Sequence, residues 1–369
     1  MKIIKKNGKI EEFDGSKIVN AITKSANRVL IKLTKEEEDK VVDFVVNSLA
    51  EKSEIEVSTI HNLVEVALEL VNPKVGQAYK EYRDYKKRFN DSFNNVLKDA
   101  ERIIYSGDKE NANKDSCINS TKMTLTAELV GKELYLNYEL PKHLSYAHRN
   151  LDMYIHDAGH RWYNMINCCL LDVANIFRGG FKLNNKKIKE PNSVEKALDL
   201  LNDIIFVASS QQYGGLTIPQ IDDLLAPYVE KSYKRLIENG YSETAAWEKL
   251  KKVVYKKLKS IQYKIECVNN AGGQTPFLTF TFGTNTTEFG RIISREMIRV
   301  RKNNMAIFPK LILLCHDDIN TAEGSPNYDI YLESIRCSMI RLYPDYCSAN
   351  QGQLKEIYDR CGTIVSAMG

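Results

Sequence analysis

Asn167, Cys168 and Cys169 have the clearest chemical potential in the sequence, because they place two adjacent thiols after an amide at the end of an aromatic and apolar run. No other segment offers comparable redox chemistry. Successive side chains of a β-strand point to opposite faces, so only one of the two sulfurs can face a given site. The alternative interpretation is that both are small buried hydrophobes, since free cysteine is among the most buried residue types.

The sequence holds eight cysteines, and no two of them are spaced as CxxC. This spacing predicts neither a zinc ribbon nor a thioredoxin-type pair, and it assigns no metal ligand. Core packing is the role that we expect for Cys267, Cys315, Cys337, Cys347 and Cys361.

A second group of candidate residues is basic. Lys5 and Lys6 stand just before the dipeptide Asn7-Gly8, and Lys17 begins a predicted helix. Cations and free helix N–H groups could therefore converge where a polyphosphate would sit. The alternative is that these lysines are plain surface residues, as lysines on a hairpin usually are.

The elements that must position these lysines are predicted by turn and capping signals. Residues 2–6 and 9–13 form two short runs joined by Asn7-Gly8, which best fits a two-residue type I′ hairpin turn. Helices with apolar faces are predicted to begin near Ser16, Thr34, Ser58 and Pro73. Residues 2–90 are therefore predicted to form a small sheet edge on a helical bundle.

The rest of the chain alternates helices with strands. Apolar residues at helical spacing predict helices near residues 121–135, 141–149, 193–209, 221–239 and 241–269. Runs of β-branched and aromatic residues predict strands at 165–170, 277–282 and 308–314. Strands separated by long helices argue for a layered or barrel α/β fold, joined to the N-terminal unit by a polar, helical connection.

Composition excludes several classes of protein. With 43% hydrophobic and 27% charged residues, the chain is typical of a soluble globular protein. A net charge of +4 gives no argument for a nucleic-acid partner, and the basic stretch 249–259 reads as one solvated helix face. The N-terminus lacks a secretion signal, and no window is apolar enough to span a membrane. We therefore expect a cytoplasmic protein with reduced thiols.

The first ninety or so residues closely resemble the ATP-cone, the regulatory nucleotide-binding module of ribonucleotide reductases. The likeness rests on Lys5-Lys6-Asn7-Gly8, Phe13, Lys17-Ile18, Ala21-Ile22, the run 57–70 and the segment Ala78-Tyr79-x-x-Tyr82-Arg83. The resemblance implies that ATP or dATP acts as an allosteric effector, contacted by Lys5, Lys6, Glu11, Lys17 and His61. Lys6 stands where the family usually has arginine and Asn7 where it has aspartate, and lysine keeps the charge without the bidentate fork.

The larger part resembles the catalytic subunit of the anaerobic, class III ribonucleoside triphosphate reductases. The matching segments, in order along the chain, are 110–116, His156-Asp157, Asn167-Cys168, 210–215, 273–277, 308–311, 326–330 and 341–345. The resemblance implies an ATP-cone over 1–92, a helical linker over 93–118, and the first half of a ten-stranded α/β barrel over 119–369. Such barrels are built from two five-stranded halves.

The resemblance also implies a reaction and its residues. In that glycyl-radical family a thiyl radical removes a hydrogen from the ribose, the 2′-hydroxyl leaves as water, and formate commonly supplies the electrons. By resemblance, Cys168 is the second active-site thiol, which donates and recovers a hydrogen, and Asn167 orients a sugar hydroxyl. Cys169 is expected to point away into packing. By resemblance His156 occupies a family position near this site, and the alternative is a hydrogen-bonded structural histidine. The family often has a second histidine two residues earlier, where this chain has Tyr154.

The last residues, ending in Met368-Gly369, resemble the approach to the loop that carries the radical-bearing cysteine. We therefore expect the chain to be the N-terminal part of a reductase, inactive without a C-terminal reductase fragment or an extein joined by splicing, with a truncated clone or incomplete gene as alternatives. The glycyl radical and a structural zinc are expected in that other half. The implied partners are a ribonucleoside triphosphate substrate, a radical-SAM activating protein and a second copy in a homodimer. The alternative function is a non-catalytic regulatory remnant that binds ATP or dATP; a different glycyl-radical enzyme is disfavoured by the cone and by Asn167-Cys168.

Overall fold

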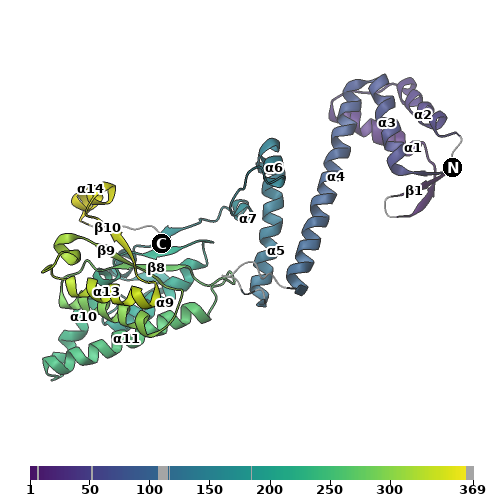
Figure 1. Ribbon diagram of the computed structural model, residues 1–369. Coiled ribbons are helices and arrows are strands. Elements are labelled where there is room, and N and C mark those ends of the chain that lie inside the picture. The colour runs from purple at the N-terminus through teal and green to yellow at the C-terminus, as the bar shows by residue number, and fades with distance from the viewer. Residues whose placement is uncertain (6–7, 51–52, 107–114, 116, 184, 363–369) are drawn as a thin grey trace. The chain divides into compact units, whose positions relative to one another are not determined.

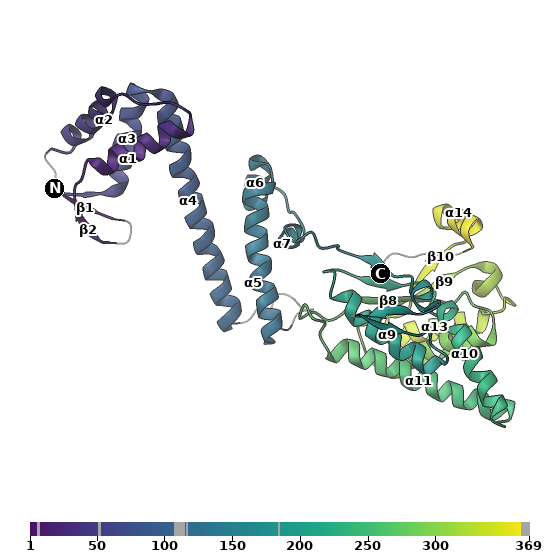
Figure 2. The ribbon, with the colours of Figure 1, turned by 180° about the vertical axis from the view of Figure 1, so that it is seen from behind.

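The computed structural model describes residues 1–5, 8–50, 53–106, 115, 117–183 and 185–362 (Figure 1, Figure 2). The chain divides into two compact units, Met1–Lys98 and Asp99–Gly369, and each has its own hydrophobic core. No helix among the described residues combines the length and the apolar character needed to cross a membrane.

The N-terminal unit opens with a three-stranded sheet in the order β2-β1-β3. Strand β1 (Lys2–Ile4) pairs antiparallel with β2 (Ile10–Glu12) and parallel with β3 (Glu54–Glu56). The predicted hairpin is confirmed, but the two-residue turn is wrong. Lys5 N donates to Lys9 O, so three residues separate this pair, and Gly8 ends the loop with φ +79°. A three-residue hairpin loop needs a left-handed residue at its end, which glycine supplies; residues 6 and 7 lie outside the described part.

Four helices complete this unit, and they confirm the predicted bundle: α1 (Ser16–Arg28), α2 (Lys35–Ser48), α3 (Val57–Val71) and α4 (Pro73–Glu101). Thr34 caps α2 through a capping box, because its hydroxyl accepts from Glu37 N while the Glu37 carboxylate accepts from Thr34 N. Ile22, Val41 and Leu68 are fully buried in the core between the helices.

Helix α4 runs without interruption across residue 92, where the sequence places the end of the cone. It ends in a π-helical turn, η1 (Arg102–Ser106), and the division between the units falls between Lys98 and Asp99. Of the predicted linker 93–118, residues 107–114 and 116 lie outside the described part of the chain.

The second unit continues after η1 with helical segments that precede its sheet: α5 (Asn119–Leu134), η2 (Tyr135–Glu139), α6 (Lys142–Arg149) and α7 (Ala158–Arg161). A further helix, α8 (Val173–Phe177), follows the first strand of that sheet. Two glycines bring α5 and α7 into backbone contact. A Cβ on Gly131 would overlap the carbonyl oxygen of Gly159, and a Cβ on Gly159 would lie 2.5 Å from the carbonyl oxygen of Glu128. The absence of side chains at both positions is what permits this approach.

A five-stranded, entirely parallel sheet forms the centre of the second unit, in the order β10-β9-β8-β7-β4. Its strands are β4 (Cys169–Leu170), β7 (Leu216–Ile218), β8 (Leu278–Phe282), β9 (Lys310–Cys315) and β10 (Asp345–Ser348). The predicted strand at 165–170 shortens to β4 and an isolated bridge between Ile166 and Gln212. A short antiparallel hairpin, β5 (Phe181–Leu183) with β6 (Lys186–Ile188), lies outside this sheet.

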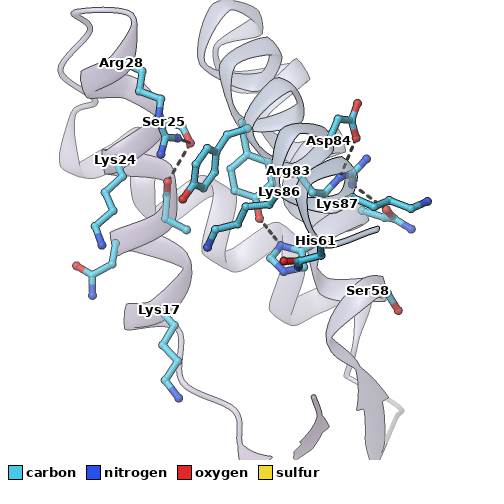
Figure 3. Close-up of a pocket in the computed structure, with 16 residues that line it drawn as sticks. Lys17, Lys24, Ser25, Arg28, Ser58, His61, Arg83, Asp84, Lys86 and Lys87 are labelled. Atoms are coloured by element: carbon cyan, nitrogen blue, oxygen red, sulfur yellow. Dashed lines mark hydrogen bonds and ion pairs between the residues drawn. The ribbon is translucent and has the colours of Figure 1, made fainter. Parts of the chain in front are cut away.

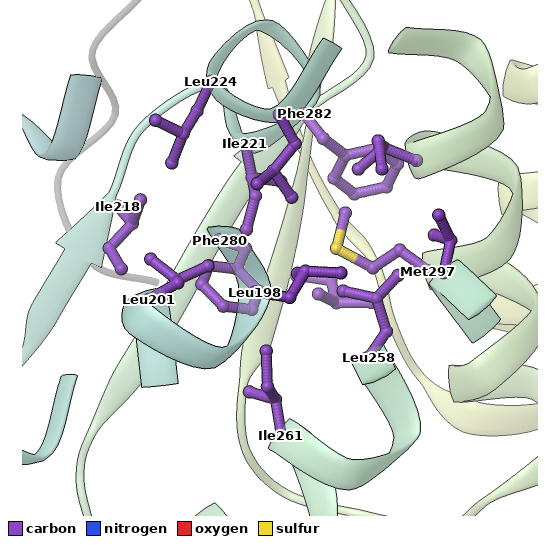
Figure 4. Close-up of a cluster of buried hydrophobic side chains, with 14 of the residues drawn as sticks. Leu198, Leu201, Ile218, Ile221, Leu224, Leu258, Ile261, Phe280, Phe282 and Met297 are labelled. Atoms are coloured by element: carbon purple, nitrogen blue, oxygen red, sulfur yellow. The ribbon is translucent and has the colours of Figure 1, made fainter. Parts of the chain in front are cut away.

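The helices between the strands are α9 (Val194–Ser209), α10 (Ile221–Glu238), α11 (Glu243–Cys267), α12 (Glu288–Asn303), η3 (Asp317–Thr321) and α13 (Tyr328–Arg341), and α14 (Gly352–Cys361) follows the last strand. Side chains alternate along β8: Phe280 and Phe282 enter the main core with Leu198 and Ile261, as Figure 4 shows, whereas Thr279 faces the opposite side. This arrangement confirms the predicted α/β fold with strands separated by helices.

A buried carboxylate connects α10 to the loop after β8. Asp222 accepts hydrogen bonds from Gly283 N at 2.9 Å and from Asn285 N at 3.0 Å. Burial, and secondarily the neighbouring Asp223, raises the pKa of Asp222 to about 6. Ionisation of this side chain is therefore less favourable in the folded unit than in the unfolded chain.

Candidate functional site

Three of the predicted cone residues meet at one carboxylate. Glu11 on β2 lies 2.9 Å from Lys17 Nζ and 3.2 Å from Lys5 Nζ, while Lys9 approaches its other oxygen at 3.4 Å. The hydrogen bonds from Lys17 and Lys5 lower the pKa of Glu11 to about 2. Glu11 therefore stays ionised and pairs with all three lysines. Lys6 lies outside the described residues.

His61, the fifth predicted cone residue, lies on α3. Its Nδ1 is 2.6 Å from the hydroxyl of Tyr79 on α4, and burial raises the pKa of Tyr79 to about 12. Because the phenol stays protonated, it can donate to Nδ1 of a neutral imidazole. Tyr79 thus fixes the ring of His61 at the wall of the site.

Two adjoining cavities connect these residues. The smaller, of about 190 Å³, is lined by Lys5, Glu11, Lys17 and His61 among others, so the four described cone residues surround one cavity. The larger, of about 780 Å³, shares Lys17 and His61 with it and extends between α1 and α4 (Figure 3).

Six cations line the larger cavity against a single acidic side chain, Asp84; they are Lys17, Lys24, Arg28, Arg83, Lys86 and Lys87. The guanidinium of Arg28 lies 3.6 Å above the ring of Tyr82, which gives the cavity a cation–aromatic wall. Sequence reasoning missed most of these cations because each alone is typical of a solvated helix face. The available signal was their recurrence on one face of α1 and one face of α4.

Asn167 and Cys168 lie together beside Gly214. Cys168 Sγ donates to Asn167 Oδ1 at 3.0 Å, and Gly214 N donates to Asn167 O at 2.7 Å. A Cβ on Gly214 would overlap the side-chain oxygen of Asn167 and would lie 2.9 Å from Cys168 Sγ. The backbone at Gly214 therefore packs directly against Asn167 and Cys168, and only glycine fits against these two residues, which we call the Asn167–Cys168 corner.

The two adjacent sulfurs differ in exposure, and Cys169 packs inward as expected. Cys168 is exposed, whereas Cys169 is half-buried and packs against the main core. Burial, and secondarily Cys168, raises the pKa of the Cys169 thiol, which keeps it protonated. Cys168 is therefore the thiol of the pair that a ligand can reach.

The five cysteines that were expected to pack in the core divide into two groups. Cys315 and Cys337 are buried and Cys347 packs on a small apolar cluster, as expected. The expectation of core packing is wrong for Cys267 and Cys361, which are exposed at the C-terminal ends of α11 and α14. Among the described residues, no group of three or more His, Cys, Asp or Glu side chains is arranged to hold a metal ion.

His156 has a 77% exposed side chain, and its imidazole pairs with the carboxylate of Asp157. Its ring meets Tyr154 edge-on, with centroids 6.2 Å apart. A second histidine, His160, stacks its ring on that of Tyr213, whose main chain contacts the segment before Cys168. Nothing in the sequence distinguished His160, because Tyr213 is distant along the chain.

Comparison with known proteins gives matches over both units. Residues 110–369 match the family model described as anaerobic ribonucleoside-triphosphate reductase, and residues 1–88 match the ATP cone domain. The anaerobic ribonucleoside-triphosphate reductase of Haemophilus influenzae is 31% identical over 372 residues, which cover 95% of this chain and 52% of the relative. The protein of that name from Enterobacteria phage T4 is 33% identical over 275 residues, covering 70% and 45%. The chain therefore spans about half the length of the curated relatives that it matches.

Solved structures agree in fold. The anaerobic ribonucleotide reductase of Thermotoga maritima, crystallised with glycerol in its active site, superposes with a TM-score of 0.55 at 15% identity, over 78% of this chain and 53% of that one. Its form with MES in the active site gives a TM-score of 0.52 at 14% identity, over the same shares of the two chains. At this identity the likeness establishes the fold alone.

Proposed function

Because the chain belongs to the anaerobic ribonucleoside-triphosphate reductase family and carries an ATP-cone domain at its N-terminus, we propose that it provides the nucleotide-regulated first half of such a reductase. The observation that carries the proposal is the exposed Cys168 thiol, held beside Asn167 by Gly214 at the start of an edge strand of the parallel sheet.

In this function, Cys168 donates a hydrogen atom to the ribose and later recovers one, and Asn167 orients a sugar hydroxyl. Exposure of the thiol and its contact with the Asn167 amide support these roles. His156 has an accessible imidazole and is retained as a candidate for proton handling during loss of the 2′-hydroxyl as water. The substrate is a ribonucleoside triphosphate, and formate is the proposed reductant.

Reduction requires the remaining half of the length found in the relatives, whether it belongs to the same polypeptide or to a separate one. We assign the radical-bearing cysteine, the glycyl radical and the structural zinc to that half. A radical-SAM protein would activate the assembled enzyme, which we expect to work as a homodimer.

The cone binds ATP or dATP as effectors. The residues present fit such a ligand: Lys5 and Lys17 supply positive charge for phosphates, and His61 supplies a polar edge within the same cavity. The surplus of cations in the adjoining cavity extends this electrostatic complementarity. Control of reduction follows if the two nucleotides prefer different states of the enzyme.

The reductase proposal is tested by reconstitution without oxygen, with the missing half, the activating protein, formate and ribonucleoside triphosphates. We expect deoxynucleotide formation that Cys168→Ser abolishes and Cys267→Ser retains, since Cys267 is also exposed but lies at the end of α11. Nucleotide binding without reduction under every combination would instead support a regulatory protein.

The effector site is tested by calorimetric titration of the chain with ATP and dATP. Lys17→Ala should weaken binding about ten-fold or more, because a charge-assisted hydrogen bond contributes about 1.5–3 kcal/mol. Lys40→Ala, at an exposed lysine on α2 that pairs with Glu36, is the matched control and should change the affinity by less than about two-fold. Equal affinities of both variants would contradict the proposed site.

A further inference from the structure

His160 and Tyr213 form a ring stack that has no role in the proposed function, next to the segment that carries Cys168. The rings are nearly parallel, with centroids 4.2 Å apart and an interplanar angle of 3°. His160 lies in the short helix α7 and is only 8% exposed, and Tyr213 directly precedes Gly214. Close ring packing of this kind restricts both side chains.

On one side, main-chain hydrogen bonds join the stack to the thiol. Tyr213 N donates to Ile166 O at 3.3 Å, and Gly214 N donates to Asn167 O at 2.7 Å. Gly214 in turn lies directly against Cys168. A displacement of Tyr213 therefore moves the peptide on which the Asn167–Cys168 corner rests.

On the other side, helix α5 holds His160. Its Nε2 lies 3.5 Å from Glu128 Oε1, and the helix that carries it approaches α5 through Gly131 and Gly159 at backbone distance. Two packed backbones leave α7 little freedom to shift. His160 is thus attached to a rigid support rather than to a loose loop.

We propose that His160 and Tyr213 are positioning residues for Cys168. The stack of their rings transmits the rigidity of the α5–α7 contact to the Asn167–Cys168 corner and so fixes the direction of the thiol. The inference rests on the proposed role of Cys168 as the hydrogen donor to the ribose. Transfer of a hydrogen atom depends steeply on the placement of donor and acceptor, so a thiol that samples several directions reacts more slowly.

The first test is amide hydrogen exchange on the full chain, followed in peptides covering residues 165–171 and 211–217. The reporters are Gly214 N–H and Cys169 N–H, which are bonded to Asn167 O and Gly215 O. Loss of a ring stack should increase their exchange about two- to ten-fold in Tyr213→Leu, whereas Tyr213→Phe should keep it near the wild-type rate. A peptide covering β8 should be unchanged, which excludes global opening.

The same stack can be tested from its other ring, by His160→Ala against the ring-keeping His160→Phe. This pair decides the question should Tyr213→Leu not fold. Wild-type exchange in both ring-removing variants would overturn the proposal. Faster exchange in Tyr213→Phe equal to that in Tyr213→Leu would overturn it too, because the hydroxyl and not the stack would then be responsible.

The second test is turnover of the reconstituted reductase. Tyr213→Leu and His160→Ala, which remove a ring, should lower kcat in proportion to their increase in exchange and leave KM unchanged. Tyr213→Phe and His160→Phe, which keep a ring, should have a kcat near that of the wild type. Exchange needs no turnover, so its outcome stands even if Cys168→Ser leaves reduction intact and the proposed function fails. Faster exchange with unchanged kcat would show that the stack supports the fold without positioning the thiol.

Discussion

Replacing Gly214 with alanine tests the packing around Cys168, because any loss of stability must come from the contacts of the added Cβ and not from backbone strain. The φ angle of Gly214 lies outside the left-handed region that would strain any side chain. The new Cβ would overlap the side-chain oxygen of Asn167 and would lie 2.6 Å from its carbonyl oxygen and 2.9 Å from Cys168 Sγ. A side chain can rotate away, but the carbonyl belongs to the backbone, so the segment before β4 must separate from residue 214.

The cost can be worked from two contributions. Separation loses the 2.7 Å hydrogen bond from Gly214 N to Asn167 O, worth about 1 kcal/mol. Overpacking of a close contact adds about 1–3 kcal/mol. We therefore expect Gly214→Ala to lower the free energy of unfolding of the second unit by about 2–4 kcal/mol, less where the two-residue edge strand β4 moves off the sheet.

Urea unfolding measures this loss, and hydrogen exchange at Cys169 N–H locates it. The matched control is Gly272→Ala in the same unit, where the nearest atom to a new Cβ would be 3.3 Å away. Gly272→Ala should remain within about 0.5 kcal/mol of the wild type. An unfolding free energy and a Cys169 exchange rate both equal to wild type in Gly214→Ala would refute the packing argument.

Two further predictions concern other parts of the chain. Because the pKa of Asp222 is raised, its contribution to stability is fully present below its unfolded pKa and is lost as pH rises through about 6. The unfolding free energy of the wild type minus that of Asp222→Asn should therefore fall by on the order of 1–3 kcal/mol between about pH 4 and pH 6. A difference that is constant over that range would contradict the assignment. Thr34→Ala removes the capping box of α2 and should destabilise the cone by about 1 kcal/mol in thermal unfolding, while Thr34→Ser keeps the hydroxyl and most of the stability; equal losses in both variants would show that the cap contributes nothing.

Strong local signals predicted much of the fold. Helices α9, α10 and α11 carry long apolar stripes, and their predicted positions agree with the structure to within two residues at each end. Strands β7 and β10 were missed because they are three and four residues long, and the three residues of β7 are buried on both faces, which leaves no alternation to detect. Helix α12 was missed although Ile293, Met297 and Val300 recur at helical spacing, so its signal was present.

The candidate site was predictable where sequence neighbours meet and unpredictable where distant segments do. Glu11 and Lys5 come together because the hairpin pairs their strands, and a turn signal predicts a hairpin. The cationic wall between α1 and α4, and the stack of His160 on Tyr213, depend on tertiary packing that no local pattern encodes. His156 was singled out by resemblance and is exposed, whereas His148 and His160 on either side of it are buried.

The paired glycines of α5 and α7 also bear on which residues related sequences can have at these two positions. Gly131 and Gly159 admit no side chain larger than hydrogen. A side chain at either position would meet main-chain atoms of the other helix, and a smaller neighbouring side chain could not make room for it. We therefore expect related chains that keep the contact between α5 and α7 to have glycine at both positions.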